Sequence, residues 1–231
     1  FCLSRGLGDV YKRQEEGRKN SWQIKFLKIT RCQLWERLFL ISDSATKCME
    51  GFYVVDVAVN RLSNFMDYIP LMISERLIDV NEDYIGQTIY VMGQFRSFNR
   101  HEEKKNRLVL SVFVRELELL DEIDEDMKTN QIFLDGYICK DPIYRKTPLG
   151  REIADLLIAV NRSYGKSDYI PCICWGRNAR FASGFEVGGH VQVWGRIQSR
   201  EYVKKLSETE TEKRVAYEVS VSKVEFIEDE E

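Results

Sequence analysis

Aromatic side chains that lie close to cations are the residues best suited to chemistry in this 231-residue chain. Three such groups lie in its C-terminal half: Arg162, Tyr164 and Lys166; Trp175 and Arg177; and Arg200, Tyr202 and Lys204. Aromatic faces stack on nucleobases and cations bind phosphates, so the combination is typical of sites for single-stranded nucleic acid. Ordinary packing is the alternative for each aromatic residue alone, and a solvated surface is the alternative for the charges, but the set favours a binding face.

Charge is distributed unevenly along the chain. Residues 140–205 contain 12 Lys and Arg against 6 Asp and Glu, whereas residues 206–231 contain 3 against 9. The formal net charge of −3 therefore excludes a uniformly basic coat but not a basic face offset by an acidic tail.

An internal repeat organises the chain. Three pairs of segments match: VDVAVNR ending at Arg61 with LLIAVNR ending at Arg162, residues 67–70 with residues 168–171, and residues 91–97 with residues 193–199. The spacing is about one domain, which is too long for a solenoid repeat. We therefore predict two copies of one domain, joined by an acidic linker at residues 121–129 and followed by an acidic tail end at residues 229–231.

The sequence pattern within each copy is that of β-structure. In the second copy, alternating segments rich in β-branched and aromatic residues occur at residues 132–134, 154–160, 170–175, 191–194 and 216–227. A single short helix is expected at residues 178–185. Five strands and one short helix in ~100 residues suit a small closed barrel, which leaves no sheet edge exposed.

The first fifty residues are unreliable evidence about the fold. Residues 1–14 resemble a translated adapter peptide, and the alternative is a natural arm carrying Lys12 and Arg13. As written, residues 34–41 form a short amphipathic helix, whereas a shifted reading frame across residues 29–49 would restore a segment similar to the start of the second copy. We favour the shifted frame within residues 15–50, so the first domain, at residues 51–120, is expected to be incomplete or degenerate.

The second copy carries an ordered set of landmarks. They are Gly136, Lys140-Asp141-Pro142, Arg145, Thr147-Pro148, Gly150, the AVNR strand end, Trp175-Gly176, Gly188-Gly189 and GRIQSREY from Gly195 to Tyr202. In order and spacing these landmarks resemble the bacterial single-stranded DNA-binding protein family, whose fold is an oligonucleotide/oligosaccharide-binding (OB) barrel. The resemblance covers residues 130–228 well and residues 52–120 more weakly. It implies an all-β chain of two tandem five-stranded Greek-key OB barrels.

The resemblance also implies which residues contact DNA. In the second domain they are Tyr164, Tyr169, Trp175, Tyr202, Arg145, Arg162, Lys166, Arg177, Arg200 and Lys204. Weaker candidates in the first domain are Arg61, Tyr68, Arg96 and Phe98. They are weaker because Ser74 occupies the place of Trp175, and Phe98 the place of Arg200. The first domain is therefore expected either to bind weakly or to act as an assembly partner.

The implied function is sequence-nonspecific binding of single-stranded DNA in replication, recombination and repair, in the bacterial cytoplasm near the nucleoid. Family members commonly present four barrels, so two per chain imply a homodimer. Replication and repair proteins are expected partners, although the acidic end FIEDEE lacks the family's hydrophobic tip. Two alternatives remain: a primosomal OB protein of replication restart, and an OB module used for protein assembly without DNA binding.

Catalysis and metal binding find no support in the sequence. Two histidines and six cysteines without a CxxC pair do not suggest a metal site, and no Ser-His or Cys-His arrangement with family spacing occurs. We therefore expect a non-enzymatic protein without a cofactor. The scattered cysteines suggest reduced thiols in the cytoplasm, and the lack of any run of ~18 apolar residues predicts no transmembrane helix.

Overall fold

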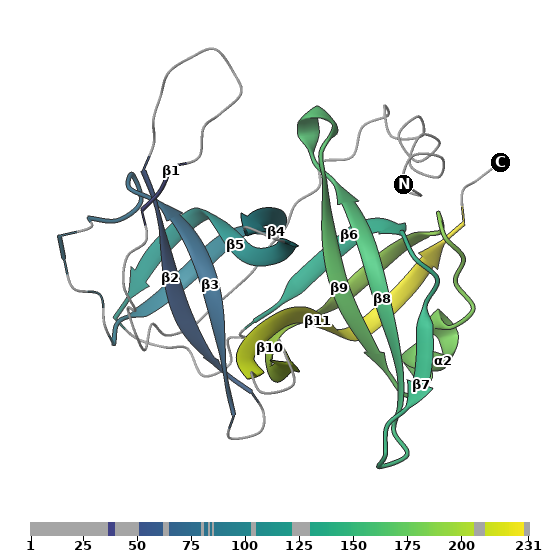
Figure 1. Cartoon of the computed structure of the whole chain (residues 1–231). Coiled ribbons are helices and arrows are strands. Elements are labelled where there is room, and N and C mark those ends of the chain that lie inside the picture. The colour runs from purple at the N-terminus through teal and green to yellow at the C-terminus, as the bar shows by residue number, and fades with distance from the viewer. Residues whose placement is uncertain are drawn as a thin grey trace. The chain divides into compact units, whose positions relative to one another are not determined.

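The computed structural model describes residues 37–39, 51–61, 65–79, 81–82, 84, 86–102, 105–121, 130–205 and 211–228 (Figure 1). The predictions for residues 1–14, for the acidic tail end and for nearly all of the linker lie outside these residues. Within residues 15–50, only the backbone of Arg37–Phe39 is described. It forms a strand paired with residues 51–53, not the helix that the written sequence suggests.

The described chain is almost entirely β-structure, which confirms the predicted all-β class. The first repeat contains β1 (Arg37–Phe39), β2 (Gly51–Asn60), β3 (Met66–Ser74), β4 (Thr88–Glu102) and β5 (Lys105–Leu120). The second contains β6 (Ile132–Ile138), β7 (Ile143–Lys146), β8 (Glu152–Asn161), β9 (Ser167–Trp175), the short helix α2 (Arg177–Ala182), β10 (His190–Lys205) and β11 (Thr211–Ile227). A 3₁₀ turn, Ser163–Gly165, links β8 to β9.

The second repeat forms a closed barrel. Its sheet order is β6-β10-β11-β9-β8-β7, and β6 also pairs with β8, so five strands close on themselves and β7 lies at the edge. Strands β9 and β11 run parallel, whereas the β8–β9 pair is antiparallel. Fully buried aliphatic side chains fill the interior, among them Leu134, Ile138, Ile158 and Ile170. Burial alternates along β8 and β9, as expected for strands with one face on a core.

Among its described residues, the first repeat has the same strand order as the second. Its sheet runs β1-β2-β3-β5-β4, again with a parallel pair, β3–β5. Within the described residues its first strand is three residues long, and β1 does not pair with β4. Among the described residues, the sheet therefore has the same strand sequence as the second barrel, without the pairing between its first and fourth strands. That the first domain is incomplete stays a prediction, because the segment in question lies mostly outside the described residues.

A glycine occurs at the same place in both repeats because neighbouring strands approach closely there. A Cβ added to Gly93 would lie 2.4 Å from the carbonyl oxygen of Phe113, and one added to Gly195 would lie 2.3 Å from that of Ser220. Both distances are too short for any side chain, and the β4–β5 register shifts at Gly93. The matching positions of these glycines thus reflect the same close approach of two strands in each repeat.

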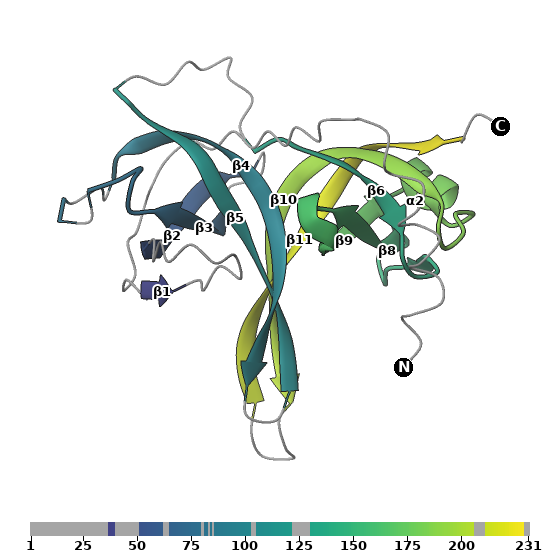
Figure 2. The same cartoon turned by 90° about the horizontal axis from the view of Figure 1, so that it is seen from above.

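The chain divides into two compact units that do not follow the repeat boundary. One unit includes Ile132–Arg196 and the chain from Glu218 onward, and the other includes Gln23–Gln131 together with Ile197–Tyr217. The reason is the length of β10 and β11, which continue well beyond the barrel as a long hairpin (Figure 2). We call residues 197–217 the β10–β11 arm.

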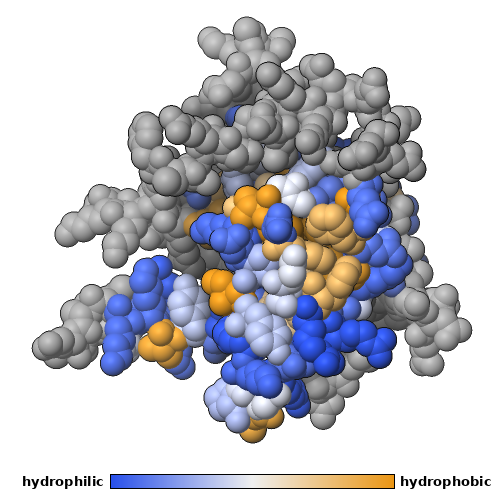
Figure 3. Space-filling model, turned by 90° about the vertical axis from the view of Figure 1, so that its right-hand side faces the viewer, coloured by the Kyte–Doolittle hydropathy of each residue, from blue (hydrophilic) through white to orange (hydrophobic). Residues whose placement is uncertain are grey.

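Helix α2 packs through small and aromatic residues. Ala179 and Ala182 are buried, and the buried ring of Phe185 contacts Phe181 and Phe226 at centroid distances of 5.0 and 5.4 Å. Phe181 and Phe226 remain partly exposed. Figure 3 shows apolar side chains gathered in the middle of the face that includes α2, with hydrophilic residues around them.

Candidate nucleic-acid interface

The outer face of the second barrel brings together Trp175 and Arg145. Strand pairing aligns Arg145 with Ile153 and Ile153 with Trp175, so the three residues form one row across β7, β8 and β9. The Trp175 side chain is 38% exposed, and its Nε1 donates a hydrogen bond to Ser220 Oγ at 3.3 Å. The indole is therefore oriented by a hydrogen bond and partly exposed, in the same row as an exposed cation.

Tyr169 lies on the same face as Trp175, because the two residues are six positions apart along β9 and side chains alternate along a strand. At about 3.3 Å per residue, the two rings stand roughly 20 Å apart. Tyr169 is half-buried and pairs with Ala159 across the sheet. The face thus offers two aromatic platforms separated by several nucleotides of an extended strand.

Three predicted cations lie exposed in this unit. Arg145 forms an ion pair with Asp155, with Nε and Nη2 at 3.0 and 2.8 Å from Oδ2, and both side chains remain well exposed. Arg177 begins α2 directly after Trp175, and Lys166 lies in the turn before β9; both are exposed. The side chain of Tyr164 lies outside the described part of the structure.

Arg162 and Arg61 hold equivalent structural ion pairs at the ends of β8 and β2. Arg162 donates to both carboxylate oxygens of Asp168, which is nearly fully buried. Arg61 does the same with the fully buried Asp67, through Nε at 2.8 Å and Nη2 at 2.6 Å. Much of the charge of both arginines is therefore already directed at a carboxylate of their own repeat.

Asp67 also fastens the β10–β11 arm within its unit. Its Oδ1 accepts hydrogen bonds from the Ser199 amide at 2.6 Å and from Ser199 Oγ at 2.9 Å, and Arg61 Nη2 donates to the Ser199 carbonyl at 2.6 Å. Burial alone would raise the pKa of Asp67, but these donors and the Arg61 charge bring the pKa below its usual value. The arm is thus held to the first repeat by an ionised, fully buried carboxylate.

The remaining predicted residues of the second repeat lie on this arm. The Tyr202 side chain is 37% exposed, and the Arg200 guanidinium lies 6.0 Å from its ring centroid. Lys204 is half-buried on the same strand. These three residues belong to a different compact unit from Trp175, so the predicted set is divided between the two units.

The weaker candidates of the first repeat differ from one another. Tyr68 is 47% exposed on β3, whereas Phe98 is half-buried on β4. The Arg96 guanidinium lies 3.9 Å from the ring centroid of Phe113 and donates hydrogen bonds to Gln94. Tyr68 is therefore the most accessible of these aromatic rings.

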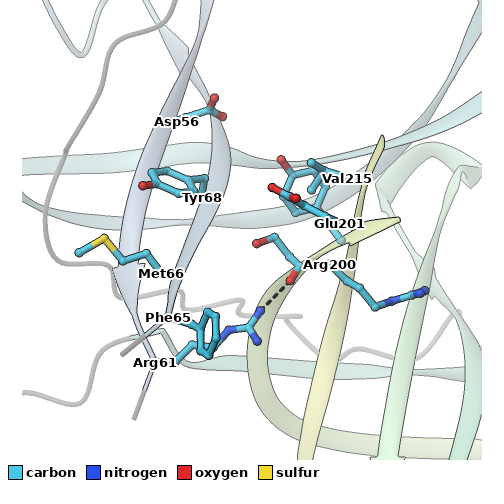
Figure 4. A pocket seen from close by; sticks show the side chains of 10 residues that line it. Asp56, Arg61, Phe65, Met66, Tyr68, Arg200, Glu201 and Val215 are labelled. Atoms are coloured by element: carbon cyan, nitrogen blue, oxygen red, sulfur yellow. Dashed lines mark hydrogen bonds between the residues drawn. The ribbon is translucent and has the colours of Figure 1, made fainter. Parts of the chain in front are cut away.

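A pocket of about 590 Å³ opens beside Tyr68, within the unit that contains the first repeat and the arm (Figure 4). Its lining residues are Asp56, Arg61, Phe65, Met66, Tyr68, Ser199, Arg200, Glu201, Val215 and Tyr217. The sequence prediction did not include Asp56. Its only signal was a mismatch between the repeats, since Leu157 occupies the equivalent position in the second copy.

The cysteine thiols of the second barrel are poor nucleophiles. Burial raises the pKa of Cys139 to about 11 and that of Cys174 to about 12, and Cys172 is fully buried with its pKa raised by the same cause. These thiols stay protonated at neutral pH. In the part of the chain that the structure describes, no three His, Cys, Asp or Glu side chains come together as a metal site would require.

Comparison with known proteins identifies the family. The model of the Single-strand binding protein family matches residues 129–227. Single-stranded DNA-binding protein B of Bacillus subtilis (strain 168) is 38% identical over 80 residues, which cover 32% of this chain and 71% of that protein. The chain belongs to the single-strand binding protein family. The family match falls on the closed second barrel, where Trp175 and Arg145 lie.

Other family members agree with this assignment. Single-stranded DNA-binding protein 2 of Listeria innocua is 36% identical over 107 residues, and single-stranded DNA-binding protein A of B. subtilis is 35% identical over the same length. The matched part covers 43% of this chain in each case, and 64% and 59% of those two proteins. The chain therefore matches less than two thirds of the length of either protein.

A solved structure extends the fold comparison to both repeats. The wild-type single-stranded DNA-binding protein from Thermus aquaticus superposes with a TM-score of 0.64 and 19% identity, covering 92% of this chain and 95% of that one. This likeness supports the predicted tandem arrangement of OB folds. No helix among the described residues is long and apolar enough to cross a membrane.

Proposed function

We propose that this protein binds single-stranded DNA with little sequence preference and acts in replication, recombination and repair. The observation that carries the proposal is the row formed by Arg145 and Trp175 on the outer face of the closed barrel, with Tyr169 farther along the same face. Trp175 supplies a π-face for a base and Arg145 a cation for a phosphate. The names of the family relatives support the same ligand.

The mechanism is binding and not catalysis. Bases stack on Trp175, Tyr169 and, on the arm, Tyr202, while Arg177, Lys166 and Arg200 contact phosphates. Stacking is tolerant of sequence because every base has a π-face, and each stacked base contributes about 1–3 kcal/mol. We further propose that two chains associate to present four barrels, that replication and repair proteins are partners, and that the protein works in the bacterial cytoplasm at the nucleoid.

Binding is expected to weaken steeply with salt. Each phosphate neutralised by a cation releases condensed counterions, so the logarithm of the binding constant falls with a slope of about −0.7 per phosphate on a single strand. Titrations with a fixed oligo(dT) from low to moderate NaCl measure this slope. Replacing Arg177 by Ala removes about one phosphate contact and should make the slope less steep by about 0.7. The far-ultraviolet circular dichroism spectrum, which reports the fold, should stay unchanged. A slope near zero would contradict a cationic track and would favour an OB module used only for protein assembly.

A further inference from the structure

The pocket beside Tyr68 combines aromatic and apolar walls with a carboxylate. Asp56 and Tyr68 stand on the same face of the β2–β3 pair, because Asp56 pairs with Pro70 and Ala58 pairs with Tyr68. Val215, Glu201 and the other arm residues form the opposite wall (Figure 4). The volume of about 590 Å³ falls within the roughly 300–1,000 Å³ that is typical of small-ligand sites.

Asp56 is a half-buried carboxylate to which no described residue donates a hydrogen bond. Among the described residues it accepts no hydrogen bond and forms no ion pair, although most buried polar groups in proteins are satisfied. Burial raises the pKa of Asp56, consistent with a carboxyl that is removed from water without compensation. A ligand that brings an N–H group into the pocket would supply the missing hydrogen bond.

The charged residues of the pocket favour entry of the base of a nucleotide over entry of its phosphate. Two carboxylates, Asp56 and Glu201, line the space, whereas the lining Arg61 is already bound to Asp67. The two carboxylates would therefore repel a phosphate. The Arg200 guanidinium points away from β2 and β3 in Figure 4. Tyr68 and Phe65, which are 47% and 71% exposed, provide the ring faces on which a base could stack.

We propose that this pocket holds one base of the bound single strand and that Asp56 reads its edge as a hydrogen-bond acceptor. The inference rests on the proposed function and adds a base preference at one position. Cytosine carries an exocyclic amino group, which can donate to a carboxylate, where thymine carries a carbonyl oxygen, which cannot. Bases with an amino group are therefore favoured over thymine in this pocket.

The second repeat has no carboxylate at the position equivalent to Asp56. Leu157 stands where Asp56 stands in the first repeat, so the two outer faces differ in whether an acceptor is present. An apolar side chain at this place permits stacking without reading the base edge. The first repeat would thus contribute selectivity, and the second repeat would contribute binding that is indifferent to sequence.

The test compares oligo(dC) and oligo(dT) of equal length at neutral pH, with the wild-type protein and the variants Asp56→Asn and Asp56→Leu. The ratio of dC to dT affinity should fall about fivefold or more in both variants, as expected for loss of one hydrogen bond to a charged acceptor. Any effect of a difference in stiffness between oligo(dC) and oligo(dT) is the same for each protein. It therefore cancels when the ratio of a variant is compared with the ratio of the wild type. Glu118→Gln is the matched control, since Glu118 is an exposed carboxylate of the same repeat outside the pocket, and it should leave the ratio unchanged.

The outcomes separate this inference from the function on which it rests. Equal factors of change for dC and dT in the Asp56 variants would overturn base reading while leaving single-strand binding intact. The same change of ratio in Glu118→Gln would also overturn it, because general charge would then be the cause. Failure of the wild-type protein to bind either strand would instead contradict the proposed function itself.

Discussion

Replacing Trp175 and Tyr202 together by Ala should weaken binding of oligo(dT) on the order of a hundredfold. Each ring contributes about 1–3 kcal/mol through a stacked base, and every 1.4 kcal/mol corresponds to a tenfold change in affinity. Both side chains are more than a third exposed, so their removal does not open a cavity in a core. Fluorescence anisotropy of a labelled oligo(dT) measures the loss without relying on tryptophan emission.

Two further variants locate the source of this effect. Trp175→Phe keeps a ring on the same face and should retain most of the affinity, whereas Tyr68→Ala removes one ring of the first repeat and should cost tenfold or less. A Tyr68→Ala loss as large as that of the double variant would mean that the first repeat binds as strongly as the second. No loss in the double variant would remove the outer face of the second barrel from the site.

Replacing Asp67 by Asn should lower the free energy of unfolding by roughly 2–3 kcal/mol. Removing one partner of a fully buried ion pair costs about 3–5 kcal/mol, and the cost is smaller here because the Arg61 side chain stays 25% exposed. The same change weakens the acceptor for the Ser199 amide, so hydrogen exchange at Ser199 should accelerate. Chemical denaturation and amide exchange measure the two effects.

Asp155→Asn is the matched control for this loss. It removes the carboxylate partner of Arg145 in an exposed pair, and such pairs contribute about 0–1 kcal/mol. The Asp67 variant should therefore be clearly the less stable of the two. Similar stabilities for the two variants would show that Asp67 does not anchor the arm.

The Asp67 variant should also change the response of stability to acid. The pKa of Asp67 is lower in the folded protein than its usual value of 3.8, so its stabilisation is complete above that value and is lost as the pH falls through the folded pKa. The stability difference between the wild type and Asp67→Asn should be constant between about pH 5 and 7 and should shrink below about pH 4. A difference that grows in acid would contradict an ionised, hydrogen-bonded Asp67.

The repeat in the sequence predicted most of the fold. The equivalence of Arg61 with Arg162 reflects the same ion pair in each repeat, and that of Gly93 with Gly195 reflects the same close approach of neighbouring strands. The length of β10 and β11 was not predicted, because the alternating pattern does not show where a strand leaves its barrel. For that reason the grouping of Ile197–Tyr217 with the first repeat came only from the structure.

The sequence predicted which residues form the candidate site better than it predicted how they are arranged in space. Exposed Trp175 and Arg145 share a face because strand register aligns them through Ile153, a pairing that sequence spacing alone does not reveal. The sequence predicts Arg61 and Arg162 as DNA-binding cations, and the structure adds that each is bound to a buried Asp six positions away. Asp56 was missed because its surroundings include arm residues that are more than 140 positions distant in sequence.

Tryptophan emission during a titration with oligo(dT) at low salt tests the central claim most directly. A base stacked on Trp175 quenches its fluorescence, so emission should fall and saturate as the strand is added, and the quenching should largely disappear in Trp175→Phe. Trp194, which packs against Phe133 at a centroid distance of 5.0 Å, should contribute little to the change. Emission that stays constant in the wild-type protein over the whole titration would contradict single-strand binding on this face.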